Sequence, residues 1–224
     1  MSYDLQEQET LDNIKAWWAQ WGNLVIGVIV TACLVFAAFN FWKIYQAKQG
    51  TEAALGFEGL QTVIKGKDNT KISAASDALA AQFPRTAFAG LGALAAGKAL
   101  FDGNDLPNAK KQLQWAADNA KDEDMRHVAR LRLVSVLLDE KNMDGAMALV
   151  NTKHPDHFAS QYADRKGDIL FIQGKLEEAR AAYLLAYDKA GKTSQARSLI
   201  QTKLEAAGGQ VKPEADAKSD KPAA

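Results

Sequence analysis

The stretch GDILFIQGKLEEARAAYLLA, residues 167–186, decides the fold of this chain. Two helix-forming segments flank Gly174, and glycine often ends a helix because it adopts left-handed backbone conformations without a steric penalty. Gly167 and Ala179 are small residues at the positions where two paired helices would come closest, and Tyr183 would fill the gap toward a neighbouring helix. The stretch therefore predicts a tightly packed helical hairpin.

Two earlier segments match this hairpin at a period near 34 residues. The first copy contains Gly97, Leu100, Asn104, Asp105, Ala109, Leu113 and Ala116, and the second contains Leu133, Val134, Leu137, Asn142, Met143, Asp144, Ala146 and Val150. The alanines of the three second helices, Ala109, Ala146 and Ala179, are 37 and 33 residues apart. Three copies in register predict stacked helical hairpins of the tetratricopeptide type, a helical solenoid. An irregular helical bundle is the alternative, and both interpretations give an all-α fold.

Further helices are expected on both sides of the three hairpins. A helix over residues 46–65 continues from the preceding segment, and a helix over residues 73–83 ends before Pro84. After the last hairpin, Thr193 or Ser194 can cap one more helix. Such terminal helices are needed to cover the open ends of a solenoid.

Residues 22–42 form an almost wholly apolar run, and no charged residue occurs between Lys15 and Lys43. As a helix the run would extend about 31 Å, which matches the roughly 30 Å of a bilayer's hydrocarbon core. Aromatic residues typical of the membrane interface stand at both of its ends. They are Trp17, Trp18, Trp21, Trp42 and Tyr45. The run therefore predicts a single transmembrane helix.

A buried core helix and a cleaved signal peptide are the alternatives to a membrane anchor. A core helix of this length normally carries polar residues on one face, and this run has no polar face. A signal peptide has a basic start and a shorter apolar region, whereas the segment before this run carries Asp4, Glu7, Glu9 and Asp12. An uncleaved anchor is the better interpretation.

The composition changes again at residue 208, after which Gly, Lys, Pro, Asp and Ala dominate. A segment of this kind cannot bury enough apolar surface to order itself. We therefore expect four parts: a short cytoplasmic segment over residues 1–21, the transmembrane helix over residues 22–42, a tetratricopeptide-like domain over residues 43–207, and a disordered tail over residues 208–224.

The sequence offers little support for catalysis, cofactors or metal. His154 and His157 flank Pro155 in an expected loop, with no further ligand at a recognisable spacing, so a solvated loop is favoured over a metal site. Gly90 and Gly92 lie in an alanine-rich helical segment, so helix packing explains them better than a dinucleotide-binding loop, which needs a preceding strand. We predict a non-enzymatic protein with no catalytic residue, cofactor or metal.

Charge and cysteine content exclude further classes. The formal net charge is zero, whereas a nucleic-acid-binding protein normally shows a basic patch. The only cysteine, Cys33, lies in the apolar run, so a disulfide scaffold is excluded.

The acidic residues Asp122, Glu123 and Asp124 are typical of a helix start, where the helix dipole favours acids. We expect His127, just after them, to be an ordinary surface residue.

Binding remains as the expected function. In tetratricopeptide arrays the first helix of each hairpin lines a concave groove, and the register of the repeats places twelve residues there. They are Leu91, Leu94, Lys98, Phe101, Val128, Leu131, Ser135, Leu138, Gln161, Asp164, Asp168 and Phe171. Each apolar member can equally belong to the core. A groove that mixes leucine, phenylalanine and carboxylates suits an extended or partly unfolded polypeptide better than a small metabolite.

The order of features along the chain carries a family resemblance. Tyr3-Asp4 precedes Ile14-Lys15-Ala16-Trp17-Trp18, the span led by Gly22 and Phe41-Trp42, and the repeats end in Gly174-Lys175, Ala179-Arg180, Tyr183, Leu199-Ile200-Gln201 and Lys203-Leu204. In this order the chain resembles the YfgM-like family, the ancillary subunits of the bacterial SecYEG translocon. The resemblance covers nearly the whole chain apart from the tail beyond about residue 208.

The resemblance implies a cytoplasmic N-terminus, one span of the bacterial inner membrane and a periplasmic repeat domain. Local charge alone does not decide this topology, because Lys15 stands on one side of the span and Lys43 and Lys48 on the other. Implied partners are SecYEG and a membrane-anchored periplasmic peptidyl-prolyl isomerase-like chaperone, beside membrane lipid and emerging secretory polypeptides. We therefore expect a member of a periplasmic chaperone network; a membrane-anchored scaffold for cell-envelope or division machinery is the alternative.

Overall fold

The computed structural model of the chain describes residues 3–211, and side chains from residue 10 onward. Every regular element among these residues is helical, which confirms the predicted all-α fold. The α-helices are α1 (Tyr3–Lys65), α2 (Asn69–Gln82), α3 (Ala87–Asp102), α4 (Leu106–Asn119), α5 (Glu123–Asp139), α6 (Met143–Val150), α7 (Ala159–Ile172), α8 (Leu176–Lys189) and α9 (Gln195–Ala206), with a short 3₁₀ helix, η1 (Asp156–Phe158), before α7. The chain forms two compact units that divide between Glu52 and Ala53.

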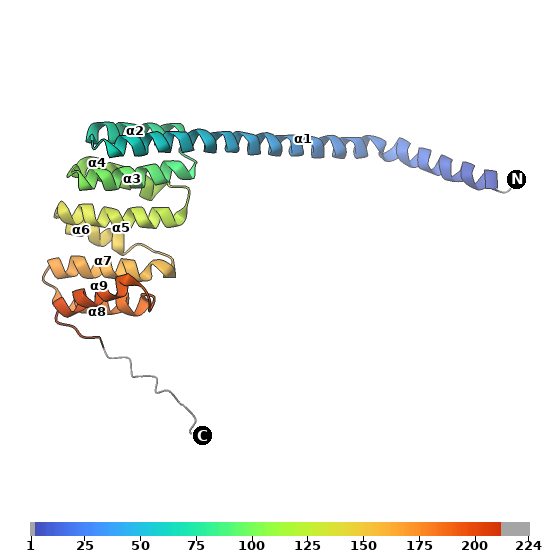
Figure 1. Cartoon of the computed structure of the whole chain (residues 1–224). Helices are drawn as coiled ribbons and strands as arrows, with labels where there is room; N and C mark the ends of the chain where they lie inside the picture. The colour runs from blue at the N-terminus through green and yellow to red at the C-terminus, as the bar shows by residue number, and fades with distance from the viewer. Residues whose placement is uncertain (1–2, 212–224) are drawn as a thin grey trace, which may run out of the picture. The chain divides into compact units, whose positions relative to one another are not determined.

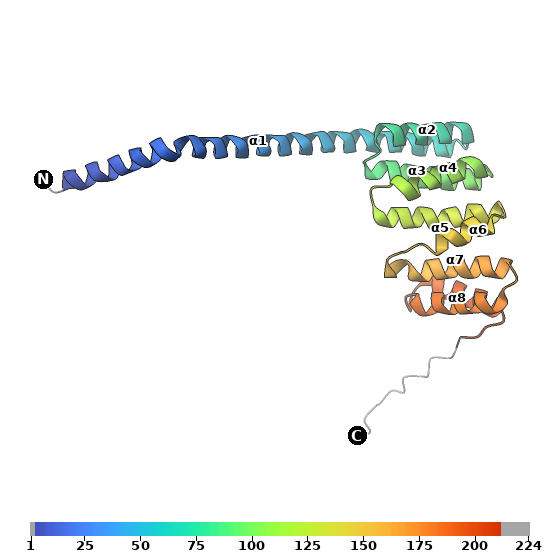
Figure 2. The ribbon, with the colours of Figure 1, turned by 180° about the vertical axis from the view of Figure 1, so that it is seen from behind.

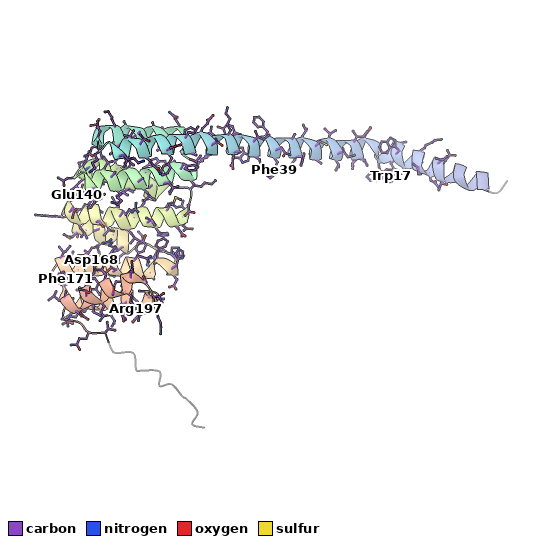
Figure 3. All side chains as sticks on the ribbon, viewed as in Figure 1. Trp17, Phe39, Glu140, Asp168, Phe171 and Arg197 are labelled. Atoms are coloured by element: carbon purple, nitrogen blue, oxygen red, sulfur yellow. The ribbon has the colours of Figure 1, made fainter. Side chains whose placement is uncertain are left out.

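The first unit contains the apolar part of α1. Among the described residues, α1 is the one helix long and apolar enough to cross a membrane, and none of its most apolar stretch is buried in the protein. Its side chains, Trp17 and Phe39 among them, stand out around the helix (Figure 3). This exposure contradicts the alternative of a buried core helix. Two polar side chains inside the run bond to their own helix: Thr31 Oγ1 donates to the Gly27 carbonyl at 2.8 Å, and Asn40 Nδ2 donates to the Phe36 carbonyl at 3.0 Å.

The second unit is a stack of helical hairpins (Figure 1). Residues 53–65 of α1 pair with α2, where Ala53 and Leu60 pack with Leu79. The pairs α3–α4, α5–α6 and α7–α8 follow, with α9 packed on α8. The three hairpins predicted from the repeat are therefore present. The first pair, which we expected as two flanking helices, is a fourth hairpin of the same kind. Helix α2 begins at Asn69, before the expected residue 73, because the Asp68 side chain caps it by accepting from the Lys71 amide at 3.1 Å.

The turn inside each hairpin repeats one backbone geometry. Lys67, Asn104, Lys141 and Gly174 have φ angles of 55°, 57°, 59° and 75°. Five residues after each of them comes a residue with at most 1% exposure, namely Ile72, Ala109, Ala146 and Ala179. Gly174 thus ends helix α7 in the left-handed conformation that the sequence predicted. Ser194 caps α9, accepting from the Ala196 amide at 3.3 Å, which resolves the expected choice between Thr193 and Ser194.

Small residues allow the paired helices to approach each other, as predicted. A Cβ atom at Gly97 would lie 2.6 Å from Leu113 Cγ, and one at Gly167 would lie 2.5 Å from the Tyr183 ring. Both separations are shorter than van der Waals contact, so any larger residue would push the helices apart. A core of fully buried side chains, such as Leu133 and Ile169, runs through the stack.

Candidate protein-binding groove

Helices α3, α5 and α7 each supply four of the twelve residues predicted to line the groove. Leu91, Lys98, Gln161 and Phe171 are exposed, while Phe101, Val128, Leu131, Ser135, Leu138, Asp164 and Asp168 are half-buried. Leu94 is 7% exposed and packs within the main apolar cluster. Leu94 is therefore a core residue, and the other eleven keep some surface on which a partner could bind.

Two adjoining hollows lie along the first helices of the hairpins. One, of about 250 Å³, lies between α3 and α5 and brings together the predicted residues Lys98, Phe101 and Ser135. The other, of about 390 Å³, lies between α3 and the end of α1, where Ile64 is part of its wall. Lys98 and Asp102 line both hollows. The hollows therefore form one continuous surface over three successive hairpins.

Two charged residues of this surface, Asp102 and Arg132, were not predicted from the register of the repeats. Asp102 pairs with Lys98 at 2.5 Å, and both side chains are more than half exposed. Arg132 lines the hollow between α3 and α5 and donates to the Leu94 carbonyl at 3.1 Å. Each lies one residue after a predicted position, Phe101 or Leu131. The strict register therefore excluded them, although neighbouring residues on a helix also border a groove.

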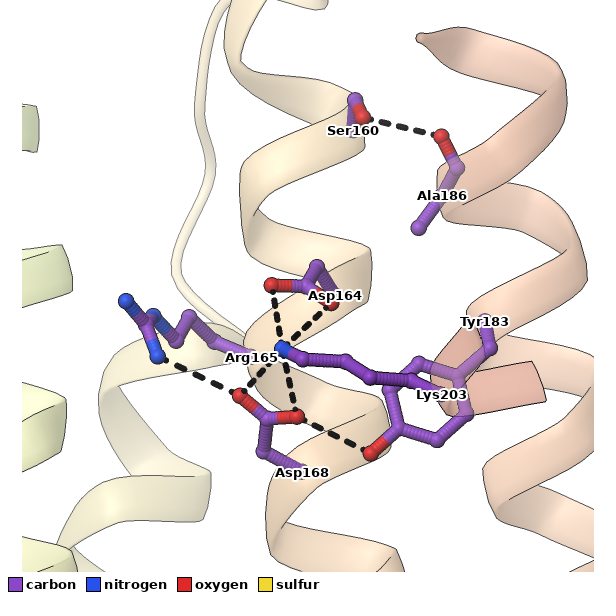
Figure 4. A network of polar contacts seen from close by, with 7 residues as sticks. All are labelled: Ser160, Asp164, Arg165, Asp168, Tyr183, Ala186 and Lys203. Atoms are coloured by element: carbon purple, nitrogen blue, oxygen red, sulfur yellow. Dashed lines mark hydrogen bonds and ion pairs between the residues drawn. The ribbon is translucent and has the colours of Figure 1, made fainter. Parts of the chain in front are cut away.

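The two carboxylates among the predicted groove residues, Asp164 and Asp168, are paired with a lysine from within the domain. Lys203 of α9 places its Nζ 2.8 Å from Asp164 Oδ1 and 2.8 Å from Asp168 Oδ1 (Figure 4). The Tyr183 hydroxyl donates to Asp168 at 2.9 Å, and Arg165 donates to the same carboxylate at 3.2 Å. Burial raises the pKa of the Asp164 carboxyl, while the hydrogen bond from Lys203 opposes that rise. These carboxylates are thus engaged in a network that fastens α9 to α7.

His127 is not the surface residue that we expected. It is 2% exposed, and its Nδ1 atom lies 2.8 Å from the hydroxyl oxygen of Tyr162. The ring of Phe158 packs 5.1 Å away, centroid to centroid. Burial lowers the pKa of His127. The expectation was wrong because His127 lies seven residues before the buried Val134, on the same inward face of α5.

The other two histidines make separate contacts around the same joint. His157 Nε2 lies 3.0 Å from Asp124 Oδ1, whereas the His154 ring stacks on Tyr162 with 4.4 Å between centroids. Over the part of the chain that the structure describes, no group of three or more histidine, cysteine, aspartate or glutamate side chains is placed to hold a metal ion.

These features define a class of protein. A helix of membrane-spanning length precedes a tetratricopeptide-like solenoid, and two adjoining hollows lie along the first helices of its first three hairpins. In known proteins, such solenoids bind other polypeptides along the surfaces that their repeats form.

Comparisons with known proteins give the family. A family model described as a tetratricopeptide repeat-like domain matches residues 15–209. The chain is 30% identical over 206 residues to the ancillary SecYEG translocon subunit of Neisseria gonorrhoeae, which covers 92% of this chain and 99% of that protein. It is 27% identical over 178 residues to the protein of the same name from Escherichia coli, which covers 79% and 85% of the two chains. The chain belongs to this tetratricopeptide repeat-like, YfgM-like family, as its sequence predicted. No solved structure matches it.

Proposed function

We propose that this chain is an ancillary subunit of the bacterial SecYEG translocon. Residues 22–42 would anchor it in the inner membrane, with the N-terminus in the cytoplasm and the repeat domain in the periplasm. The proposal is supported by the names of its relatives, which align with it over most of their length, and by the helix of membrane-spanning length. In this role the protein binds other proteins and catalyses no reaction.

The observation that carries the proposal is the pair of adjoining hollows over α1, α3 and α5. Its walls combine apolar side chains such as Ile64 and Phe101 with the exposed pair Lys98–Asp102. An extended polypeptide emerging from a translocon presents both apolar side chains and free backbone polar groups, and a surface of this mixed kind meets both. We infer that emerging secretory polypeptides bind here first, because Asp164 and Asp168 are already engaged by Lys203.

The membrane anchor strengthens this binding. A domain tethered beside the translocon meets each emerging chain at a high effective concentration, so a weak groove is sufficient. In the same position the repeat domain would meet a membrane-anchored peptidyl-prolyl isomerase-like chaperone and pass polypeptides to it. The protein would thereby belong to a periplasmic chaperone network.

Site-specific photocrosslinking in intact cells tests the proposal. A photoreactive amino acid at Phe101 or Leu138 should give adducts with an arrested secretory chain and with SecYEG subunits. The same amino acid at Gln114, an exposed residue of α4 outside the hollow, is the matched control. Adducts confined to proteins of envelope synthesis or division would instead support the scaffold interpretation, and equal secretory adducts at all positions would refute a specific groove.

A further inference from the structure

Helix α6 is shorter than the second helices of the two neighbouring hairpins. The second helices α4 and α8 have 14 residues each, whereas α6 has eight and ends at Val150 (Figure 2). Thr152 Oγ1 donates to the Leu149 carbonyl at 2.8 Å and closes the end of the helix, and Pro155 cannot continue it. The chain then crosses to α7 without further α-helix. The turns that would continue the row of second helices are therefore missing.

A pocket of about 580 Å³ lies where those turns are missing, between the end of α6, helix α7 and helix α8. On α7 it is lined by Ala159, Tyr162, Ala163, Lys166 and Leu170. Successive residues of a helix are about 100° apart around its axis, which places these five opposite the predicted groove positions Gln161, Asp164, Asp168 and Phe171. The pocket is therefore a second surface, separate from the proposed polypeptide groove.

The lining suits a helix. Ala163 and Ala182 contribute only methyl groups, so the backbone of a bound helix could approach closely, as small residues permit between packed helices. Val150 and Leu170 give apolar walls, and Leu185 is 52% exposed at the edge. A large apolar side chain left this open beside a pocket is typical of a binding surface.

The rim offers one positive and one negative side chain outside any ion pair of the described residues, Lys166 and Glu178. The Lys166 ammonium contacts only the Asn151 side-chain oxygen, at 3.3 Å, and no ion pair joins Lys166 or Glu178 to another described residue. Lys189, also at the rim, is already held by Asp156 at 2.9 Å. Lys166 of α7 and Glu178 of α8 line the same pocket, so both charges are available to one bound segment.

We propose that this pocket binds a short amphipathic helix of a partner polypeptide, lying where the missing turns of α6 would continue. Apolar side chains of that helix at i, i+3, i+4 and i+7 would fill the pocket. An acidic residue at one edge would pair with Lys166 of α7, and a basic residue at the other edge would pair with Glu178 of α8. The surface leaves the groove on the opposite face of α7 free for a second polypeptide.

Peptide binding to the full chain in lipid nanodiscs, measured by fluorescence anisotropy, tests the proposal. One synthetic helical peptide carries an apolar stripe with one glutamate and one lysine at its edges, a second has lysine at both edges, and a third is the first one scrambled. We expect the first peptide to bind the parent chain more tightly than the other two.

Leu185→Asp should weaken binding of the first peptide about tenfold or more, because a buried leucine contact is lost. Leu184→Asp, on an exposed neighbour outside the pocket, should change the affinity less than twofold.

A charge substitution gives the second readout. Lys166→Glu makes both rim charges negative, so this variant should prefer the peptide with two lysines over the mixed one. The proposal would be overturned if the Lys166→Glu variant still preferred the mixed peptide. It would also be overturned if the variants at Leu184 and Leu185 lost equal amounts of peptide affinity. It would also fail if Leu185→Asp abolished self-association of the full chain in sedimentation without affecting the peptide, because the occupant would then be a second copy. Crosslinks from Phe101 report on the proposed translocon function alone and should be unchanged in the variants at Lys166 and Leu185. A failure of the pocket proposal can therefore be told apart from a failure of that function.

Discussion

The hydroxyl oxygen of Tyr162 lies 2.8 Å from Nδ1 of His127, which joins the hairpin α5–α6 to the hairpin α7–α8. Both side chains are at most 2% exposed, and they lie 35 positions apart in the chain, on either side of the short helix α6. Since α6 covers less of the stack than α4 or α8, the joint depends on this polar contact and on the rings of Phe158 and His154 around it.

Acid should loosen this joint. Burial lowers the pKa of His127 in the folded chain. Below about pH 6.5, the ordinary pKa of histidine, His127 therefore binds a proton in the unfolded chain but not yet in the folded chain. The free energy of unfolding should therefore fall as the pH drops from 6.5 toward the lowered pKa, by at most about 1.4 kcal/mol per pH unit. Urea unfolding of the full chain in detergent between pH 5 and 7.5, followed by circular dichroism, measures this slope.

Two variants assign the slope to the histidine. His127→Gln keeps a polar partner for Tyr162 and should flatten the slope. Tyr162→Phe removes the hydrogen bond and should cost about 1–2 kcal/mol at every pH in this range, with the slope retained. Burial raises the pKa of Tyr162, so its hydroxyl stays protonated throughout. An unchanged slope in His127→Gln would contradict this account.

The network around Lys203 should contribute to stability. Lys203→Met leaves the carboxylates of Asp164 and Asp168, each with 16% of its side chain exposed, without the ammonium that bridges them. We expect a loss of about 1–3 kcal/mol in urea unfolding, below the full cost of an unpaired buried charge because Arg165 still contacts Asp168. Adding Asp164→Asn to this variant should restore part of the loss. Lys121→Met, at an exposed lysine, is the control and should change stability by less than about 0.5 kcal/mol.

The hairpins were predictable where side-chain size determines the packing. Gly167, Gly174 and Ala179 each have one physical role, and the structure places them as expected. The first hairpin was harder to recognise, because Lys67 and Ile72 occupy the positions that Gly174 and Ala179 fill in the last one. Backbone geometry repeats there although the residue types do not.

Contacts between distant segments could not be predicted from the register. The repeat places Asp164 and Asp168 on one face of α7, but it gives no sign that Lys203, 39 and 35 residues later, reaches them. His127 was misplaced because the neighbouring acids suggested a solvated helix start. The short α6 follows from Pro155, whereas the pocket beside it also depends on how α8 packs against α7.

Two glycines of the second unit should respond oppositely to alanine. At Gly167 the added Cβ would lie 2.5 Å from the Tyr183 ring, so Gly167→Ala should destabilise the domain by about 1–3 kcal/mol. At Gly59, inside α1, a Cβ meets nothing within 4 Å, so Gly59→Ala should stabilise it by about 0.5–1 kcal/mol through helix propensity. Thermal unfolding of both variants under one condition makes the comparison. The same sign for both changes would mean that the close approach of α7 and α8 is not the determining factor.

Membrane attachment should fail when charge enters the middle of the apolar run. Val30 and Leu34 are exposed on α1 and lie one turn apart, near the centre of residues 22–42. Two lysines at these positions would cost roughly 5–7 kcal/mol of insertion free energy, which is comparable with the roughly 3–7 kcal/mol that the apolar residues of the run provide. When cell membranes are extracted at alkaline pH, the variant Val30→Lys/Leu34→Lys should therefore appear in the soluble fraction. The control variant Val30→Leu/Leu34→Ile should stay in the membrane pellet. A doubly charged variant that remained in the pellet would show that other parts of the chain hold it at the membrane.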